Sequence, residues 1–199
     1  MTEPAREPSR LPSRKALQQR VAAAILDAAA HTFATRGERA NLSDVAVAAG
    51  MARATVYRYF PNRRRLLDEL ARHAAEDAHE RLKATRISAV PIEEGVTRAV
   101  RAFVDMGDAF VVLVRERGAG GTEADEFERR VARPLREMLE SGRAAGRIRE
   151  DIPADSLAEF LVGIVAAAVQ HGSLDRDDTV ATITRAFLGG ALAAPSRVR

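Results

Sequence analysis

The stretch LSDVAVAAGMARATVYRYFPNRRRLLDEL, residues 42–70, decides the fold of this chain. It holds a small residue, Ala46, followed four positions later by Gly50 and six positions after that by Val56. Two short helices that cross closely need a small side chain at the crossing, and the tight turn between them favours glycine, which adopts a left-handed conformation without steric cost. Val56 then falls on the inner face of the second helix. The stretch therefore predicts a helix-turn-helix whose second helix covers about residues 53–60.

Helical periodicity continues on both sides of this motif. Apolar residues recur at three- and four-residue spacing from Leu17 to Arg36, and Asn41 is a suitable N-cap for the short helix that ends at Gly50. Strong β-formers do not cluster into alternating runs. We therefore predict an all-α protein of about nine helices, with a three-helix DNA-binding head that contains the helix-turn-helix and a larger helical body. The further helices are expected near residues 66–82, 96–104, 110–114, 127–139, 156–171 and 178–192.

The charge is distributed unevenly along the chain. Residues 1–65 carry 12 Lys and Arg against 5 Asp and Glu, whereas the remainder carries 19 against 23. A basic first third on an acidic remainder is expected when a phosphate-binding head sits on a separate body. The basic N-terminal arm either tracks the DNA minor groove or stays disordered, and the sequence leaves both open. The predicted boundaries are 1–16 for the arm, 17–62 for the helix-turn-helix domain, 63–192 for the larger body, and 193–199 for a tail.

Several function classes find no support in the composition. The chain has no cysteine, so it cannot form a disulfide or a thiolate metal site. Its four histidines form no pair at i, i+4 spacing, and no nucleophile–base motif is present, so we expect no metal, no cofactor and no enzyme activity. The longest apolar run, 161–169, is shorter than the roughly 20 residues that span a bilayer, and the polar N-terminus does not resemble a secretory signal. We therefore expect a cytoplasmic protein without a membrane partner.

Residues 42–70, together with the preceding ILDAAAHTFATRG (residues 25–37), resemble the DNA-binding domain of the TetR family of transcriptional regulators. The likeness covers about a quarter of the chain. Two positions depart from the usual family pattern: Ala54 stands where glycine is common, and Asn41 where threonine is common. The resemblance implies a homodimer that binds a palindromic operator in double-stranded DNA and responds to a small-molecule effector of unknown identity, most often as a repressor released by that effector.

The resemblance also implies roles for residues of the head. The recognition helix opens with Arg53, Ala54 and Thr55, which would approach base edges. An arginine can bond O6 and N7 of guanine, and a methyl group can contact thymine. Phe60, by contrast, is expected in the core because apolar aromatic side chains are mostly buried. The side chains expected to bond phosphates are those of Asn41, Ser43, Tyr57, Tyr59 and Arg63.

In the body, the resemblance implies an effector pocket enclosed by the fourth to seventh helices, with the fourth helix as the lever between pocket and head. The last two helices would form the dimer interface. The candidate pocket residues are Phe103, Met106, Phe110, Leu113, Phe127, Val131, Met138 and Phe160. The candidate interface residues are Phe160, Gly163, Ile164, Ala167, Ala168, Ile183 and Phe187.

Two other readings of the sequence remain open. One is a helix-turn-helix protein without an effector, such as an architectural or accessory DNA-binding factor. The other is a small all-α enzyme, which the absence of catalytic motifs argues against.

Overall fold

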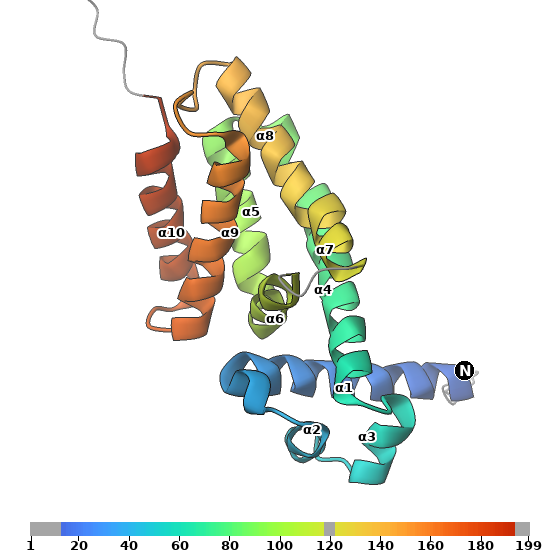
Figure 1. Ribbon diagram of the computed structural model, residues 1–199. Helices are drawn as coiled ribbons and strands as arrows, with labels where there is room; N and C mark the ends of the chain where they lie inside the picture. The colour runs from blue at the N-terminus through green and yellow to red at the C-terminus, as the bar shows by residue number, and fades with distance from the viewer. Residues whose placement is uncertain (1–12, 118–121, 194–199) are drawn as a thin grey trace, which may run out of the picture.

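The computed structural model describes residues 13–117 and 122–193 of the chain. Within these ranges the protein is built of α-helices joined by short turns, with a single isolated bridge between Ile148 and Leu192 (Figure 1). The predicted all-α class is confirmed. Most of the predicted N-terminal arm and nearly all of the predicted tail lie outside the described residues.

The head consists of α1 (Arg14–Arg36), α2 (Leu42–Ala48) and α3 (Arg53–Tyr59), which pack around their own apolar core. The first helix begins three residues earlier than the periodicity predicts. The reason is a cap: the Ser13 hydroxyl oxygen accepts a hydrogen bond from the backbone N–H of Ala16 at 3.2 Å. The predicted boundary between arm and head, at residue 16, therefore falls inside α1.

Helix α4 (Arg63–Thr85) joins the head to the body. It begins at Asn62, whose side-chain oxygen accepts a hydrogen bond from the backbone N–H of Arg65 at 2.9 Å. Leu66, Leu67 and Leu70 of its first turns are buried in the head core, whereas Ala74, Ala75, Ala78 and Leu82 further along are buried in the body core. One helix thus belongs to both parts, as expected for the fourth helix.

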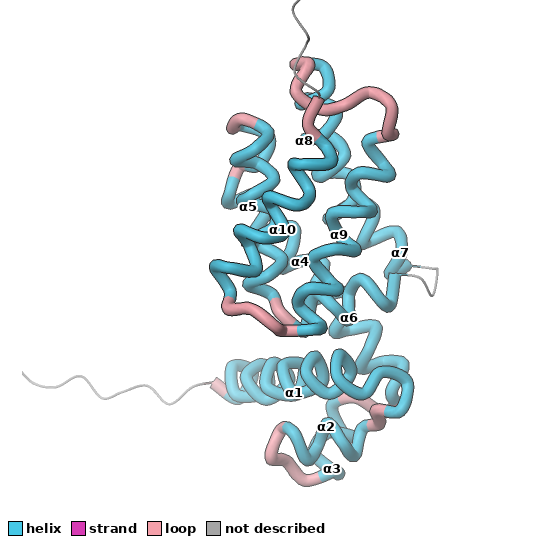
Figure 2. Tube along the Cα trace, turned by 90° about the vertical axis from the view of Figure 1, so that its left-hand side faces the viewer, coloured by secondary structure: helices cyan, strands magenta, loops and turns pink. Residues whose placement is uncertain are grey.

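The body lies on the opposite side of α1 from the helix-turn-helix (Figure 2). Its remaining helices are α5 (Ile92–Met106), α6 (Asp108–Glu116), α7 (Thr122–Phe127), α8 (Arg133–Ala144), α9 (Ala154–His171) and α10 (Arg176–Ala191). A π-helical turn over Glu128–Ala132 runs without a break from α7 into α8, so these two are the single seventh helix that the sequence predicts. Pro134 gives a reason for the irregular turn, because a proline cannot donate the backbone hydrogen bond that a regular α-helix needs there.

Helix α9 is the one helix of the described chain that is long and apolar enough to cross a membrane by length and composition. The apolar character of α9 extends beyond the nine-residue run at 161–169, because Ala154, Leu157, Ala158 and Phe160 precede that run in the same helix. One face of α9, including Leu157, Leu161 and Val165, is buried in the body core. The core helix of a soluble protein meets the same criterion, so length and composition alone do not indicate a membrane span here.

Candidate nucleic-acid interface

The helix-turn-helix has the geometry that its spacing predicts. Ala46 and Val56 are both buried, where α2 and α3 face each other. Gly50 has a φ of +63°, and the backbone N–H of Met51 reaches back to the carbonyl of Ala46 at 2.9 Å to close the turn. A Cβ added to Gly50 would meet nothing within 4 Å. The glycine is therefore required by its backbone conformation and not by crowding.

A reciprocal cap fixes the start of α2. The side-chain oxygen of Asn41 accepts hydrogen bonds from the backbone N–H groups of Ser43 at 2.8 Å and Asp44 at 3.1 Å. In return, the Asp44 carboxylate accepts from the backbone N–H of Asn41 at 3.0 Å, and it also pairs with Arg36 at 2.7 Å. The cap uses the amide oxygen of Asn41 and leaves its amide nitrogen, the side-chain donor that a phosphate contact requires.

The outer face of α3 carries the residues expected to touch DNA. Arg53 and Ala54 are exposed at its first turn and Thr55 is partly exposed beside them, while Val56 anchors the opposite face. Such a helix can enter a major groove while its inner face stays in the protein core. Phe60, the residue that ends α3, is buried in the head core, which confirms the expectation that it is a packing residue.

The two tyrosines of α3 lie in different surroundings. Tyr57 is exposed and its hydroxyl can reach outward. Tyr59 is partly buried against the head core, and the guanidinium of Arg58 lies over its ring at 5.6 Å from the centroid. Arg58 is exposed on the outer face of α3 and adds a cation to this surface.

Arg63, a predicted phosphate ligand, is tied into the head. Its Nε donates to the carbonyl of Ala40 at 3.1 Å, and its Nη2 donates to the carbonyl of Gly37 at 3.4 Å. Its guanidinium also lies over the ring of Phe33, 5.2 Å from the centroid. These contacts link the start of α4 to the end of α1, so any phosphate contact would use only the remaining edge of the guanidinium.

Two polar contacts that the sequence did not reveal connect the head to the body. His31 of α1 and Asp108 of α6 approach to 2.9 Å, and Arg115 of α6 donates to the carbonyl of Phe33 at 2.9 Å. Their partners are 77 and 82 residues apart in the chain, so no spacing rule could have paired them. They hold α6 against the first helix of the head.

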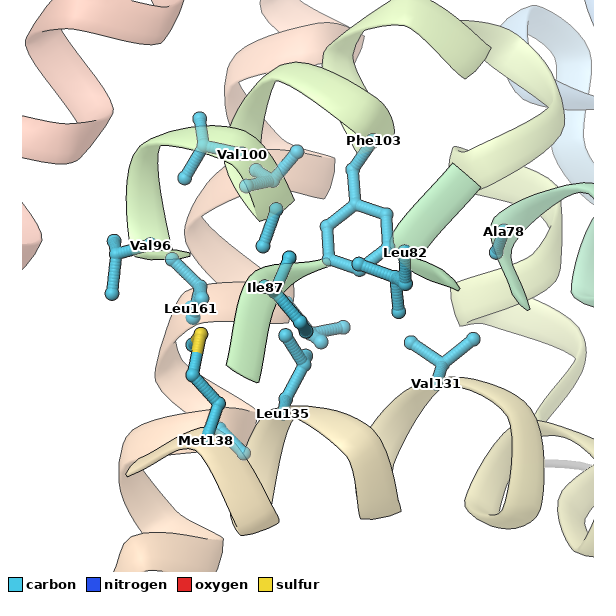
Figure 3. Close-up of a cluster of buried hydrophobic side chains, with 14 of the residues drawn as sticks. Ala78, Leu82, Ile87, Val96, Val100, Phe103, Val131, Leu135, Met138 and Leu161 are labelled. Atoms are coloured by element: carbon cyan, nitrogen blue, oxygen red, sulfur yellow. The ribbon is translucent and has the colours of Figure 1, made fainter. Parts of the chain in front are cut away.

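Seven of the eight candidate pocket residues lie together in the body core, and Figure 3 shows part of this cluster. The rings of Phe103 and Phe110 are stacked with centroids 4.4 Å apart. Near one edge, the guanidinium of Arg117 lies over the ring of Phe127 at 4.7 Å and also pairs with Glu159 at 2.7 Å. In this conformation the side chains pack directly against one another. The buried members are Phe103, Met106, Phe110, Leu113, Phe127, Val131 and Met138.

The eighth, Phe160, is 54% exposed on the outer face of α9, away from this cluster. Ile164, one turn further, is 39% exposed, and Gly163 and Ala167 are exposed beside it, so these residues form an outward apolar stripe. Ala168 is only partly buried behind the stripe.

The candidate interface residues of α10 point the other way. Ile183 and Phe187 are only 3% and 5% exposed and pack in the chain's own core, which differs from the expectation. Periodicity identifies an apolar face of a helix but does not say whether the same chain or a second copy covers it. The residues that α10 leaves exposed next to them include Thr182 and Ala186.

The described residues contain no group of three or more histidine, cysteine or acidic side chains that could hold a metal ion.

The comparisons with known proteins match this geometry. Residues 25–70 match the family model of bacterial regulatory proteins of the tetR family. The HTH-type transcriptional repressor LfrR of Mycolicibacterium smegmatis is 35% identical over 99 residues, which cover 50% of this chain and 52% of the repressor. That match thus spans only about half the length of the relative. The uncharacterized HTH-type transcriptional regulator YhgD of Bacillus subtilis is 24% identical over 184 residues, covering 85% of this chain and 95% of the relative.

Solved structures extend the likeness to the body. The crystal structure of LfrR from Mycobacterium smegmatis in complex with proflavine has a TM-score of 0.72 and 26% identity, and covers 89% of this chain and 99% of that chain. The structure of the ketosteroid transcriptional regulator KstR2 of Mycobacterium tuberculosis has a TM-score of 0.68 at 21% identity, covers 95% of this chain and 100% of that chain, and supports the fold alone.

Proposed function

We propose that the chain is a member of the TetR family of bacterial regulatory proteins and a sequence-specific DNA-binding transcriptional regulator, because residues 25–70 match the family model and the whole fold resembles that of LfrR. It acts in the cytoplasm as a homodimeric repressor that a small-molecule effector releases from a palindromic operator in double-stranded DNA. The observation that carries this proposal is the first turn of α3, which exposes Arg53 and Ala54 while Val56 is held in the head core.

The residues at the start of α3 are proposed to contact the bases. Arg53 offers two parallel donors to guanine, and the methyl groups of Ala54 and Thr55 suit thymine. Contacts with phosphates fix the register of the protein on the duplex but carry no sequence information. The proposed phosphate ligands are Asn41 and Ser43 at the start of α2, Tyr57 and Tyr59 on α3, and Arg63 at the start of α4.

The second copy covers the apolar stripe of Phe160, Gly163, Ile164 and Ala167 on α9. Exposed apolar side chains of this size on a continuous helix face mark an interaction surface, and the small residues between them allow close approach of a second helix. A twofold dimer would present two copies of α3 to successive major grooves, about 34–36 Å apart. A palindromic operator follows from that symmetry.

The effector occupies the body core between Phe103, Phe110 and Phe127. The related repressor LfrR was crystallised with proflavine, which supports a small-molecule effector here. A ligand shifts a two-state equilibrium only when it binds one state better than the other. Opening space beside Phe110 must move α6, which is bonded to α1 through Arg115, and with it the head. Helix α4, buried in both cores, transmits the same movement.

Selection of bound sequences from a random DNA pool, followed by footprinting, tests the proposal. One short palindrome is expected, and the Arg53→Ala protein should bind it about 10- to 100-fold more weakly, since a bidentate arginine–guanine contact is worth about 1–3 kcal/mol. Arg133→Ala, which removes another exposed arginine, located on the body, is the control and should bind normally. Unchanged binding by Arg53→Ala would refute the groove assignment. Protection of many unrelated sites would instead indicate an architectural protein.

A further inference from the structure

A groove of about 740 Å³ lies beside the first half of α4, outside the body core in which the effector is proposed to bind. Its walls come from four parts of the chain: α1, the turn between α3 and α4, the first half of α4, and the end of α7. Small-molecule sites typically measure about 300–1,000 Å³, so the groove has room for a compact organic ligand.

The apolar part of the groove lining, which we call its floor, comes from Ala22 of α1, Ala71 of α4, and Phe60 and Pro61 at the turn between α3 and α4. Ala71 and Phe60 contribute little of this surface, since they are only 2% and 7% exposed. Tyr59 lines the groove as well and offers an aromatic edge. A flat ring system would bury apolar area on such a floor and find an aromatic neighbour.

The acidic side chains that line the groove are already neutralised by arginines. Asp68 pairs with Arg64 at 2.6 Å, and Glu69 pairs with Arg72 at 2.6 Å. The hydrogen bond from Arg72 holds the pKa of Glu69 below its usual value, so this carboxylate stays ionised and engaged. Glu126 is contacted by two arginines of the π-helical turn. None of these carboxylates is left to attract a cationic ligand.

Arg65 is the exception among the charged groups of the groove. The backbone N–H of Arg65 donates a hydrogen bond to the side-chain oxygen of Asn62. Within the described part of the chain, however, its guanidinium has no carboxylate partner. A guanidinium beside an apolar floor recognises a carboxylate through charge-assisted, bidentate hydrogen bonds. We propose that this groove is a second small-molecule site, which binds an aromatic carboxylate with its ring against Ala22 and Ala71 and its carboxylate on Arg65.

Calorimetric titration of the full chain, without DNA, tests this site with two probes of equal size. The anionic probe is 2-naphthoate and the neutral probe is 2-naphthamide. We expect one naphthoate per chain, bound about tenfold more tightly than the amide, because only the anion gains the contact with Arg65.

Three variants locate the site. Arg65→Gln should reduce the naphthoate affinity about tenfold, to that of the amide, and leave the amide unchanged. Ala22→Leu narrows the floor at a partly exposed helix position that accepts leucine, and should weaken both probes. Arg39→Gln, which removes another exposed head arginine distant from the groove lining, should affect neither. Circular dichroism checks that each variant is folded.

Two results would overturn the proposal. One is the absence of saturable naphthoate binding to the unmodified protein. The other is a naphthoate affinity that stays unchanged in either Arg65→Gln or Ala22→Leu, which would place the probe elsewhere, for instance in the body core. Because DNA is absent from the assay, neither result bears on operator binding.

Discussion

Phe110 and Val111 are neighbours in α6, yet their side chains belong to different cores. Phe110 stacks on Phe103 inside the body, whereas Val111 is 3% exposed among the apolar residues of the head. The short helix α6 therefore has one face in the part of the protein proposed to bind the effector and another in the part proposed to bind DNA. A displacement on one side of this helix cannot leave the other side in place, because both faces are closely packed.

Shortening Val111 should weaken the head more than the body. Val111→Ala removes two methyl groups from a buried site and should lower the free energy of unfolding by about 2 kcal/mol. Hydrogen exchange should show faster opening of α1 than of α9 in this variant. Val114→Ala on the same helix, at a partly buried position beside the body core, is the control and should not selectively loosen α1. Equal loss of protection in head and body would argue against the division of α6 between two cores.

The turn of the helix-turn-helix should depend on the conformation of Gly50. Gly50→Ala forces a Cβ onto a residue with φ +63° and should destabilise the protein by about 1 kcal/mol, although the space for the methyl group is free. Gly50→Asn should cost less, since asparagine tolerates the left-handed region better than alanine does. Chemical denaturation of both variants measures the difference. Equal stability of the alanine variant and the unmodified protein would show that the turn relaxes to another conformation.

Arg63 should stabilise the head through its contacts with the chain. Arg63→Ala leaves the carbonyls of Ala40 and Gly37 without this donor and removes the cation from the ring of Phe33, so a loss of about 1–3 kcal/mol in unfolding free energy is expected. Arg63→Lys should recover only part of it, because an ammonium group cannot reproduce the planar, multiply donating guanidinium. Denaturant titration without DNA isolates this effect. Full recovery by lysine would mean that charge alone matters at this position.

A charge on the outer stripe of α9 should prevent dimer formation. Phe160→Glu places a carboxylate where the second copy is proposed to pack and should shift the protein to monomers in sedimentation experiments, because an unpaired charge is costly to bury. Val47→Glu, at the 78% exposed Val47 of α2, tests the general effect of a new surface carboxylate and should leave the oligomeric state unchanged. A Phe160→Glu protein that sediments like the unmodified dimer would exclude this stripe as the interface.

Local spacing in the sequence was sufficient to predict the DNA-binding head. Ala46, Gly50 and Val56 lie within eleven residues of one another, and the cap of Asn41 involves residues two and three positions away. Helix periodicity, capping and turn conformation act over such short distances, and each is encoded by the residue types themselves. The burial of Phe60 and the helical class of the whole chain follow from the same local rules.

Tertiary structure decided which residues far apart in the chain contact one another. It places the Arg63 guanidinium against the carbonyls of Ala40 and Gly37, which are 23 and 26 residues away. It also buries Phe187 in the core and leaves Phe160 exposed. It also gave α6 a place in both cores and brought Ala22 together with Arg65 at the groove. An apolar or charged side chain on a helix face has the same local pattern whichever partner it meets. Only the packing of whole helices selects that partner, since the choice depends on contacts between residues far apart in the chain.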